Sequence, residues 1–334
     1  MCCLFGFYNY SGRAIKGLDK LTNMLAHEAT ERGTDATGIS YNKNNRLITY
    51  KRPESAFKMN FQGVEDVRCV IGHTRHATQG RKQDNCNNHP FIGNCQNNVF
   101  ALAHNGVLFN DTALHTTYKL PYTRIQTDSY IAVQLLEHFK TLNNQNIKKM
   151  CELLRGSYCF SILDNDDVLY LVKGDNPLHL IHFPKRKLYV YASTDDILFR
   201  ALIDTMLFDD IQNNEFEMIT FEAETILQIL PNGDIISSEF VQDYGYSYSY
   251  GRSSNWYDYG WYDDDEWEDL TEIAAKSKKT TKTTKTTYNA DVDVDLEYLE
   301  QVKAYARYAG YEDDDVDYLL ASGCTLDEVA EMFC

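Results

Sequence analysis

Two adjacent cysteines follow the first residue in the segment Met1-Cys2-Cys3-Leu4-Phe5. Removal of Met1, which the small side chain of Cys2 permits, would leave a thiol and a free α-amine on one residue. The α-amine has an ordinary pKa of about 8, so it can take the thiol proton directly or through one water molecule. Cys2 is therefore a candidate N-terminal nucleophile. The alternative is that Cys2 and Cys3 only begin a buried strand, since cysteine is one of the most buried residue types.

Polar clusters are predicted at the ends of two short apolar strands. Residues 69–71 lead into the polar segment 72–78, and residues 99–103 lead into the segment 104–107. The second segment contains Asn105-Gly106, and an Asn-Gly pair between apolar strands is also a strong hairpin signal. A site and a turn both remain open for this pair.

Groups in these two clusters, together with Asp128, suit the recognition of an amino acid. Arg75 offers a planar guanidinium that can hold a carboxylate with two hydrogen bonds. The side chain of Asn105 and the backbone N–H of Gly106 can stabilise an oxyanion. Asp128, near the predicted start of a helix, can hold a substrate ammonium group.

These residues must be positioned by a mixed set of helices and strands. Apolar residues recur at helical spacing over residues 17–32, and Gly33 stands where a helix C-cap glycine would. Thr127 or Asp128 is expected to cap the helix that runs to His138. Further helices are expected at 147–154 and 197–208, and strands at 2–10, 39–41, 46–50, 69–71, 99–103, 158–163, 168–172, 179–183, 188–192, 218–221, 226–230 and 235–240. Helices between two sets of strands predict a layered α+β domain.

The composition indicates which kinds of partner the protein can bind and in which cellular compartment it works. The chain has 49 acidic and 32 basic residues and a net charge of −17, which disfavours nonspecific binding to nucleic acid or to anionic membranes. Its nine cysteines lack the density of a secreted disulfide scaffold, so a reducing, cytoplasmic location is expected. We expect no signal peptide and no membrane span.

The composition changes after about residue 240. Residues 241–290 contain a Tyr/Gly/Ser-rich stretch, an acidic block and a Lys/Thr-rich stretch, which predicts a low-complexity linker. Residues 291–334 are predicted to form a small helical unit, in which Thr325 to Glu328 read as a capping box. The expected organisation is therefore a domain at 2–240, a linker at 241–290 and a helical unit at 291–334.

Zinc binding is a competing interpretation of several histidines and cysteines. The candidates are His73, His76, Cys86, His89 and Cys95. Their spacing lacks the closed four-ligand signature of a structural zinc site, so no metal is expected.

Six segments, in the same order, resemble the motifs of class II glutamine amidotransferase domains. They are MCCLFGF (1–7), ERGTDATG (31–38), IGHTRHATQG (71–80), NNHPF (87–91), AHNGVLFN (103–110) and TDSY (127–130). The resemblance continues more loosely, through segments such as Ala192 to Asp195, to about residue 240.

This resemblance implies the four-layer αββα sandwich of N-terminal-nucleophile hydrolases. It implies that Cys2 attacks the side-chain amide of glutamine, forms a γ-glutamyl thioester and releases ammonia. Asn105 and Gly106 correspond to the oxyanion pair. No cofactor is expected for this chemistry.

The resemblance also implies how glutamine is held. Arg75 corresponds to the anchor of the α-carboxylate and Asp128 to the anchor of the α-ammonium group. Thr78 and the backbone near Ala77 correspond to further glutamine contacts.

Two departures from the family pattern shape the functional prediction. Cys3 stands where the family usually has glycine, and on a strand its side chain should point away from that of Cys2. Family members usually carry a fused synthase that consumes the ammonia, whereas residues 241–334 contain no nucleotide-binding glycine loop. Ammonia would then pass to a separate synthase or be released by a free-standing glutaminase. The alternative is an inactive scaffold that interacts through its C-terminal helices.

Overall fold

A computed structural model describes residues 2–242 and three further positions, Lys303, Asp313 and Val316. The chain divides into two units, Met1–Asp263 and Asp264–Cys334. Residues 303, 313 and 316 are helical. The rest of the predicted linker and helical unit lies outside the described residues.

The first of two sheets has seven strands and contains the N-terminal strand near its centre. Every neighbouring pair in it is antiparallel. Its order is β11 (Glu217–Ile219), β9 (His179–Phe183), β10 (Leu188–Ala192), β1 (Cys3–Asn9), β4 (Cys69–Arg75), β2 (Ala36–Lys43) and β3 (Arg46–Arg52).

The second sheet has six antiparallel strands. Its order is β13 (Ile235–Glu239), β12 (Thr225–Ile229), β8 (Leu169–Lys173), β7 (Gly156–Asp164), β6 (Val99–Leu108) and β5 (Phe91–Asn94). The predicted segment 99–103 is thus the first half of β6.

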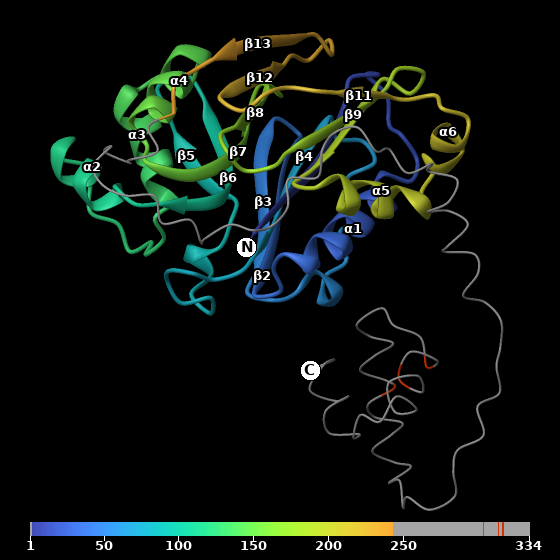
Figure 1. Ribbon diagram of the computed structural model, residues 1–334, viewed down its shortest axis with the longest axis horizontal. Coiled ribbons are helices and arrows are strands. Elements are labelled where there is room, and N and C mark those ends of the chain that lie inside the picture. The colour runs from blue at the N-terminus through green and yellow to red at the C-terminus, as the bar shows by residue number, and fades with distance from the viewer. Residues whose placement is uncertain (1, 243–302, 304–312, 314–315, 317–334) are drawn as a thin grey trace, which may run out of the picture. The chain divides into compact units, whose positions relative to one another are not determined.

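Helices cover the outer face of each sheet (Figure 1). The seven-stranded sheet packs against α1 (Leu18–Glu28), α5 (Asp195–Ile203) and α6 (Phe208–Gln212). The six-stranded sheet packs against α2 (Asp111–Thr117), α3 (Tyr130–Phe139) and α4 (Asn144–Leu153). A third apolar cluster fills the space between the two sheets. The predicted αββα sandwich is confirmed.

The apolar strands follow from this layering, because a strand between two apolar layers must be apolar on both faces. In β1, Phe5 and Phe7 pack toward α1 and α5, whereas Leu4 and Tyr8 pack into the cluster between the sheets. All seven residues of β1 are buried. Even-numbered residues of β1 therefore face the second sheet.

The two polar clusters extend their strands instead of ending them. Strand β4 continues to Arg75, because β1 and β2 pair with it on both sides. Strand β6 continues to Leu108, and Asn105-Gly106 pairs in register with Cys159 and Tyr158 of β7. The hairpin interpretation of Asn105-Gly106 is therefore wrong.

The structure also corrects two helix boundaries. The helix α1 ends at Glu28 and continues as a short 3-10 helix to Glu31, so Gly33 is not its cap. Gly33 is needed because an added Cβ would lie 2.5 Å from the carbonyl carbon of Arg75. The helix α3 begins at Tyr130 after Ser129, which makes no side-chain cap, and Asp128 instead accepts a hydrogen bond from the backbone of Leu108.

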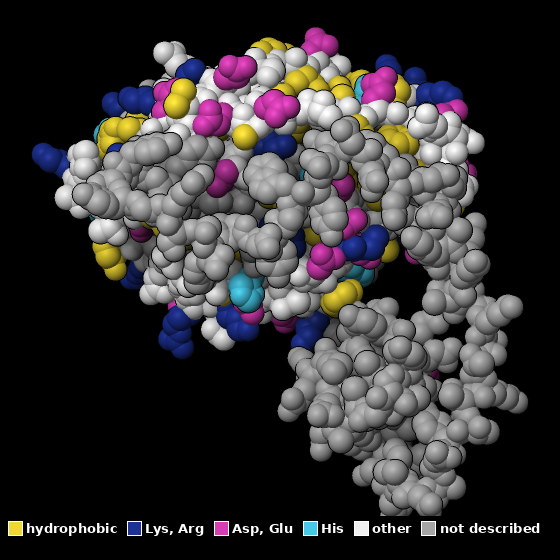
Figure 2. All heavy atoms as spheres, viewed as in Figure 1, with side chains coloured by type: hydrophobic (Ala, Val, Ile, Leu, Met, Phe, Trp, Pro, Cys, Tyr) yellow, Lys and Arg dark blue, Asp and Glu magenta, His cyan; other side chains and the backbone are white. Residues whose placement is uncertain are grey.

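Charged side chains of both signs are interspersed on the face of the described domain drawn in Figure 2. Across the residues that the structure describes, no helix combines the length and the apolar character that a membrane crossing requires.

Candidate active site

The start of β1 is fixed by hydrogen bonds from three other segments. Two hydrogen bonds join Leu4 to Ser193. Leu4 N–H donates to Ser193 Oγ at 2.8 Å, and Ser193 N–H donates to the Leu4 carbonyl at 2.9 Å. Arg32 Nε donates to the carbonyl of Cys2 at 3.0 Å. Cys3 pairs with Thr74, which brings Cys2 next to Arg75 at the end of β4. The half-buried Cys2 is therefore held in one place.

The alternation of side chains directs three site residues into the space between the sheets. Leu4, Ile71 and Ala103 all belong to the apolar cluster there. Side chains two residues apart on a strand share a face, so Cys2, Arg75 and Asn105 point into the same space at the polar end of the strands.

Cys3 points the other way, as predicted. It lies in the apolar cluster beneath α1 and α5 and is fully buried. Burial raises the pKa of its thiol to about 11. Cys3 therefore does not crowd the space that Cys2 faces and stays protonated at neutral pH.

The Cys2 thiol is bonded to the backbone of a single residue. His76 N–H donates to Cys2 Sγ at 3.4 Å, and the Cys2 thiol donates to the carbonyl oxygen of His76 at 3.6 Å. Burial raises the pKa of the thiol; the positive charge of Arg75 opposes this rise and the negative charge of Asp128 adds to it. Within residues 2–242, no side chain with a basic group hydrogen-bonds to this sulfur. A thiol nucleophile at this position would need a base, and the α-amine that Met1 removal would create is the group adjacent to it.

Asn105 has an amide group with an unused donor. Its side chain is 2% exposed, and among the described residues its Nδ2 has no hydrogen-bond partner. Asn176 Nδ2 donates to the Asn105 backbone carbonyl at 2.9 Å and fixes this part of β6. A buried donor without a partner is costly unless a ligand or water fills the place. The donor is thus available for an oxyanion.

Gly106 allows β6 to pass close to β7. Its φ of 149° lies in a region that favours glycine, and an added Cβ would be 1.9 Å from the carbonyl oxygen of Ser157. The residue type is therefore required by the backbone beside Asn105.

Arg75 is buried and is oriented by uncharged oxygens. Its Nη1 donates to Asn88 Oδ1 at 2.7 Å, and its Nη2 donates to the carbonyls of Gln79 and Gly80. None of the ion pairs found among the described residues includes Arg75. Its charge therefore remains available to a carboxylate.

Asp128 is also buried and keeps part of its carboxylate free. Its Oδ2 accepts a hydrogen bond from Leu108 N–H at 2.6 Å, and its Oδ1 lies 3.5 Å from Ser129 Oγ. Its charge is felt by both Cys2 and Arg75, although it forms no ion pair with Arg75. An unpaired cation and an unpaired anion near one thiol suit a zwitterionic substrate.

Ala77 and Thr78 begin the loop that leaves β4. Ala77 N–H donates to Asp35 Oδ2 at 2.8 Å, and Lys82 pairs with the other oxygen of Asp35 at 2.7 Å. The Ala77 N–H is thus committed to Asp35, which fixes the loop beside His76. The side chain of Thr78 is exposed.

Three buried histidines lie behind this site. The rings of His73 and His89 are 4.2 Å apart, and His73 Nε2 donates to the carbonyl of His104 at 3.0 Å. Burial lowers the pKa of His73 to about 3 and also lowers the pKa values of His89 and His104. The three rings are therefore neutral.

The histidines do not come together with the cysteines of the competing zinc interpretation. Cys86 is exposed, and Cys95 donates to the carbonyl of Leu136. In the part of the chain that the structure describes, no group of three or more His, Cys, Asp or Glu side chains is placed to hold a metal ion.

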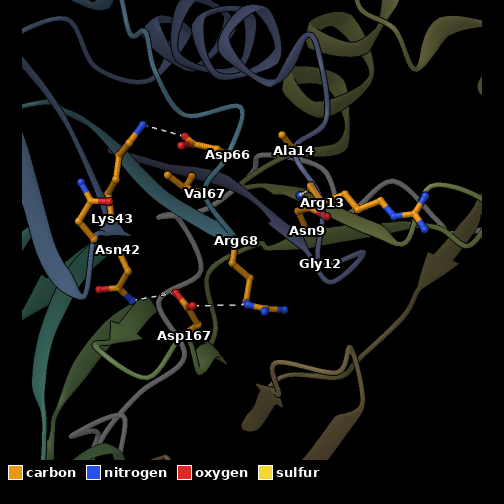
Figure 3. A pocket seen from close by; sticks show the side chains of 11 residues that line it. Asn9, Gly12, Arg13, Ala14, Asn42, Lys43, Asp66, Val67, Arg68 and Asp167 are labelled. Carbon is orange, nitrogen blue, oxygen red and sulfur yellow. Dashed lines mark hydrogen bonds and ion pairs between the residues drawn. The ribbon is translucent and has the colours of Figure 1, made fainter.

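A polar pocket of about 280 Å³ lies at the other end of β1, next to Asn9 (Figure 3). Two of its cations are already paired, Lys43 with Asp66 at 2.7 Å and Arg68 with Asp167 at 3.4 Å. The pocket contains none of the predicted site residues.

Three positioning residues were not assigned from the sequence: Arg32, Ser193 and Asn176. Arg32 and Ser193 hold the start of β1, and Asn176 holds Asn105. All three lie in segments that carry the family resemblance, so the resemblance is the feature of the sequence that could have indicated them.

Comparison with known proteins agrees with this geometry. Residues 73–200 match the family model described as a glutamine amidotransferase domain. Two relatives are named glutamine--fructose-6-phosphate aminotransferase [isomerizing]. The one from Streptococcus agalactiae is 30% identical over 190 residues, which is 53% of this chain and 30% of the relative. The one from Staphylococcus aureus is 32% identical over 195 residues, which is 54% of this chain and 30% of the relative. This chain thus spans less than a third of the length of these relatives.

Two solved structures share the fold. Glutamine phosphoribosylpyrophosphate (PRPP) amidotransferase from B. subtilis, complexed with ADP and GMP, has a TM-score of 0.57 and 23% identity, covering 72% of this chain and 50% of that chain. A structure described as the allosteric regulatory enzyme of purine biosynthesis has a TM-score of 0.57, 22% identity and the same coverage.

The layers and the first strand define an N-terminal-nucleophile hydrolase fold. The domain-level match and the relatives are glutamine amidotransferases, which confirms that the described domain resembles class II glutamine amidotransferase domains, as predicted from the sequence.

Proposed function

We propose that the protein hydrolyses the side-chain amide of glutamine, with Cys2 as the nucleophile after removal of Met1. The observation that carries this proposal is the Cys2 thiol, which has no side-chain base within residues 2–242 but shares its residue with the α-amine that processing would free. The α-amine takes the thiol proton as sulfur attacks the amide carbon.

The neighbouring groups support the remaining steps. Attack turns the amide oxygen into an oxyanion, which Asn105 Nδ2 and the backbone of Gly106 stabilise. The protonated α-amine then gives its proton to the departing nitrogen, which leaves as ammonia. Water attacks the γ-glutamyl thioester, releases glutamate and restores the thiol. Arg75 binds the α-carboxylate and Asp128 the α-ammonium group, and Thr78 provides a further contact.

The ammonia passes to a separate synthase or is released into solution. The relatives carry their named aminotransferase activity on chains of which this one spans less than a third, so a group that accepts the ammonia would lie outside the described domain. We place the reaction in the cytosol, because all seven described cysteines are free thiols.

Glutamate and ammonia release by protein lacking Met1 tests this proposal. A matched protein that retains one extra residue before Cys2 should lose turnover by at least ~10³-fold at unchanged melting temperature, because its nitrogen at Cys2 is a non-basic amide. Equal rates in the two proteins would exclude the α-amine as the base. Absence of turnover in the processed protein would favour the inactive scaffold.

A further inference from the structure

One asparagine side chain helps to orient Arg75, the carboxylate anchor of the proposed site. Arg75 Nη1 donates to Asn88 Oδ1 at 2.7 Å, and Asn88 is fully buried. Asn88 Nδ2 donates in turn to the carbonyl of Lys82 at 3.0 Å and to Asn85 Oδ1 at 3.2 Å. Asn88 thus directs the Nη1 side of the Arg75 guanidinium, while the carbonyls of Gln79 and Gly80 hold Nη2.

Asn88 is itself held by a lysine from the first sheet. Lys51 Nζ, which projects from β3, donates to the backbone carbonyls of Asn88 and Pro90, the latter at 3.0 Å. The ammonium also lies 5.0 Å from the centre of the Phe91 ring. The Lys51 ammonium therefore links the residues on both sides of His89 to β3, the edge strand of the seven-stranded sheet.

The segment around His89 rests directly on the hairpin that carries Lys51. Gly38 pairs with Lys51 across β2 and β3, and a Cβ at Gly38 would lie 2.3 Å from the carbonyl oxygen of His89. The close packing leaves the ammonium few alternative partners.

We propose that Lys51 is a positioning residue for glutamine binding: it fixes Asn88, and Asn88 orients Arg75 toward the substrate carboxylate. This inference rests on the proposed function, because it assigns a binding role to Arg75. Lys51 does not touch the substrate, so it should affect KM far more than kcat.

The charge of Lys51 makes this role dependent on pH. Burial lowers the pKa of Lys51 to about 8, the charge of Arg75 lowers it further, and the Cys86 thiol opposes this. The buried rings of His73 and His89 also lie near Lys51, whose charge lowers their pKa values, and both rings stay neutral over this pH range. Lys51 is protonated below about pH 8 and neutral above it, so its hydrogen bonds to the two carbonyls weaken as the pH rises. KM for glutamine should then increase above about pH 8.

Steady-state glutamine hydrolysis by the processed full-length protein, from pH 6.5 to 9.5, tests the proposal. At pH 7, Lys51→Met should raise KM by about tenfold, the loss expected for one charge-assisted hydrogen bond, with kcat within about twofold. Lys51→Arg, which stays charged, should keep KM low to pH 9. Lys43→Met removes the other lysine of the same hairpin, which pairs with Asp66 beside the polar pocket, and should match the wild type.

Each outcome bears on a definite claim. A wild-type KM and pH profile in Lys51→Met would overturn the role of Lys51 while leaving the proposed function intact. Absence of turnover in the processed wild type, together with no calorimetric glutamine binding by Cys2→Ser, would overturn both. If Lys51→Met does not fold, Asn88→Ala breaks the same connection and should raise KM with kcat kept; an unchanged KM in that variant would also refute the connection.

Discussion

At the scale of single residues, two adjacent cysteines have opposite surroundings. Cys2 faces the space between the sheets, and within residues 2–242 its thiol hydrogen-bonds only to the backbone of His76, whereas Cys3 is packed beneath α1 and α5. The high pKa of Cys3, about 11, keeps it unreactive at neutral pH.

Substituting each cysteine should separate catalysis from packing. We predict that Cys2→Ala abolishes glutamine hydrolysis and leaves the melting temperature nearly unchanged, because its side chain is only partly buried. Cys3→Ala should keep most of the activity but lower the free energy of unfolding by about 1 kcal/mol, since it removes one buried heavy atom. Activity assays and thermal unfolding of both variants check this; an inactive Cys3→Ala with an active Cys2→Ala would assign the nucleophile to Cys3.

At the scale of elements, β6 places the proposed oxyanion donors, and at Gly106 it passes close to β7. We predict that Gly106→Ala lowers the free energy of unfolding by about 3 kcal/mol or more, since the added Cβ meets the Ser157 carbonyl and φ is 149°. Gly12→Ala is the control, because Gly12 also has a positive φ, 70°, but open space around its Cβ position. It should cost about 1 kcal/mol. Denaturant unfolding of the two variants measures the difference, and equal costs would show that the contact with β7 is unimportant.

At the scale of the whole molecule, the apolar core of the described domain is complete by Phe240. The three apolar clusters of the described residues draw on nothing beyond it. Gln242 is buried and donates to the carbonyl of Gly156 at 2.7 Å, so the domain reaches at least this residue, two beyond the predicted boundary.

We predict that a protein ending at Gln242 folds and hydrolyses glutamine with the kinetics of the full chain. A protein ending at Glu222 is the control: it loses β12 and β13, and with them the buried Ile226, Leu227 and Ile229, worth about 1.5–3 kcal/mol each. It should not fold cooperatively. Circular dichroism melts and glutamate release compare the proteins. Loss of folding in the longer truncation would mean that residues 243–334 contribute to the core.

The sequence by itself predicted the elements that depend on local pattern. Strand β1 and helix α1 were predicted, because the spacing of their apolar residues and the turn residues that follow them determine both elements. Strand β5 and helices α2 and α6 were not predicted, since each is short and depends on its neighbours. The residue types supplied the candidates Cys2, Arg75, Asn105, Gly106 and Asp128, and the family resemblance added Ala77 and Thr78 and assigned the roles.

Only the tertiary structure decided what those residues face. Whether Asn105-Gly106 turns or continues β6 depends on pairing with β7, and that pairing joins residues more than fifty positions apart. The direction of Arg75 depends on Asn88 and, through it, on Lys51 of another strand. Local sequence encodes the period of a strand, but hydrogen bonds between distant segments form only when the two sheets pack together. For this reason the sequence indicated the chemistry, and the packing of the sheets decided its geometry.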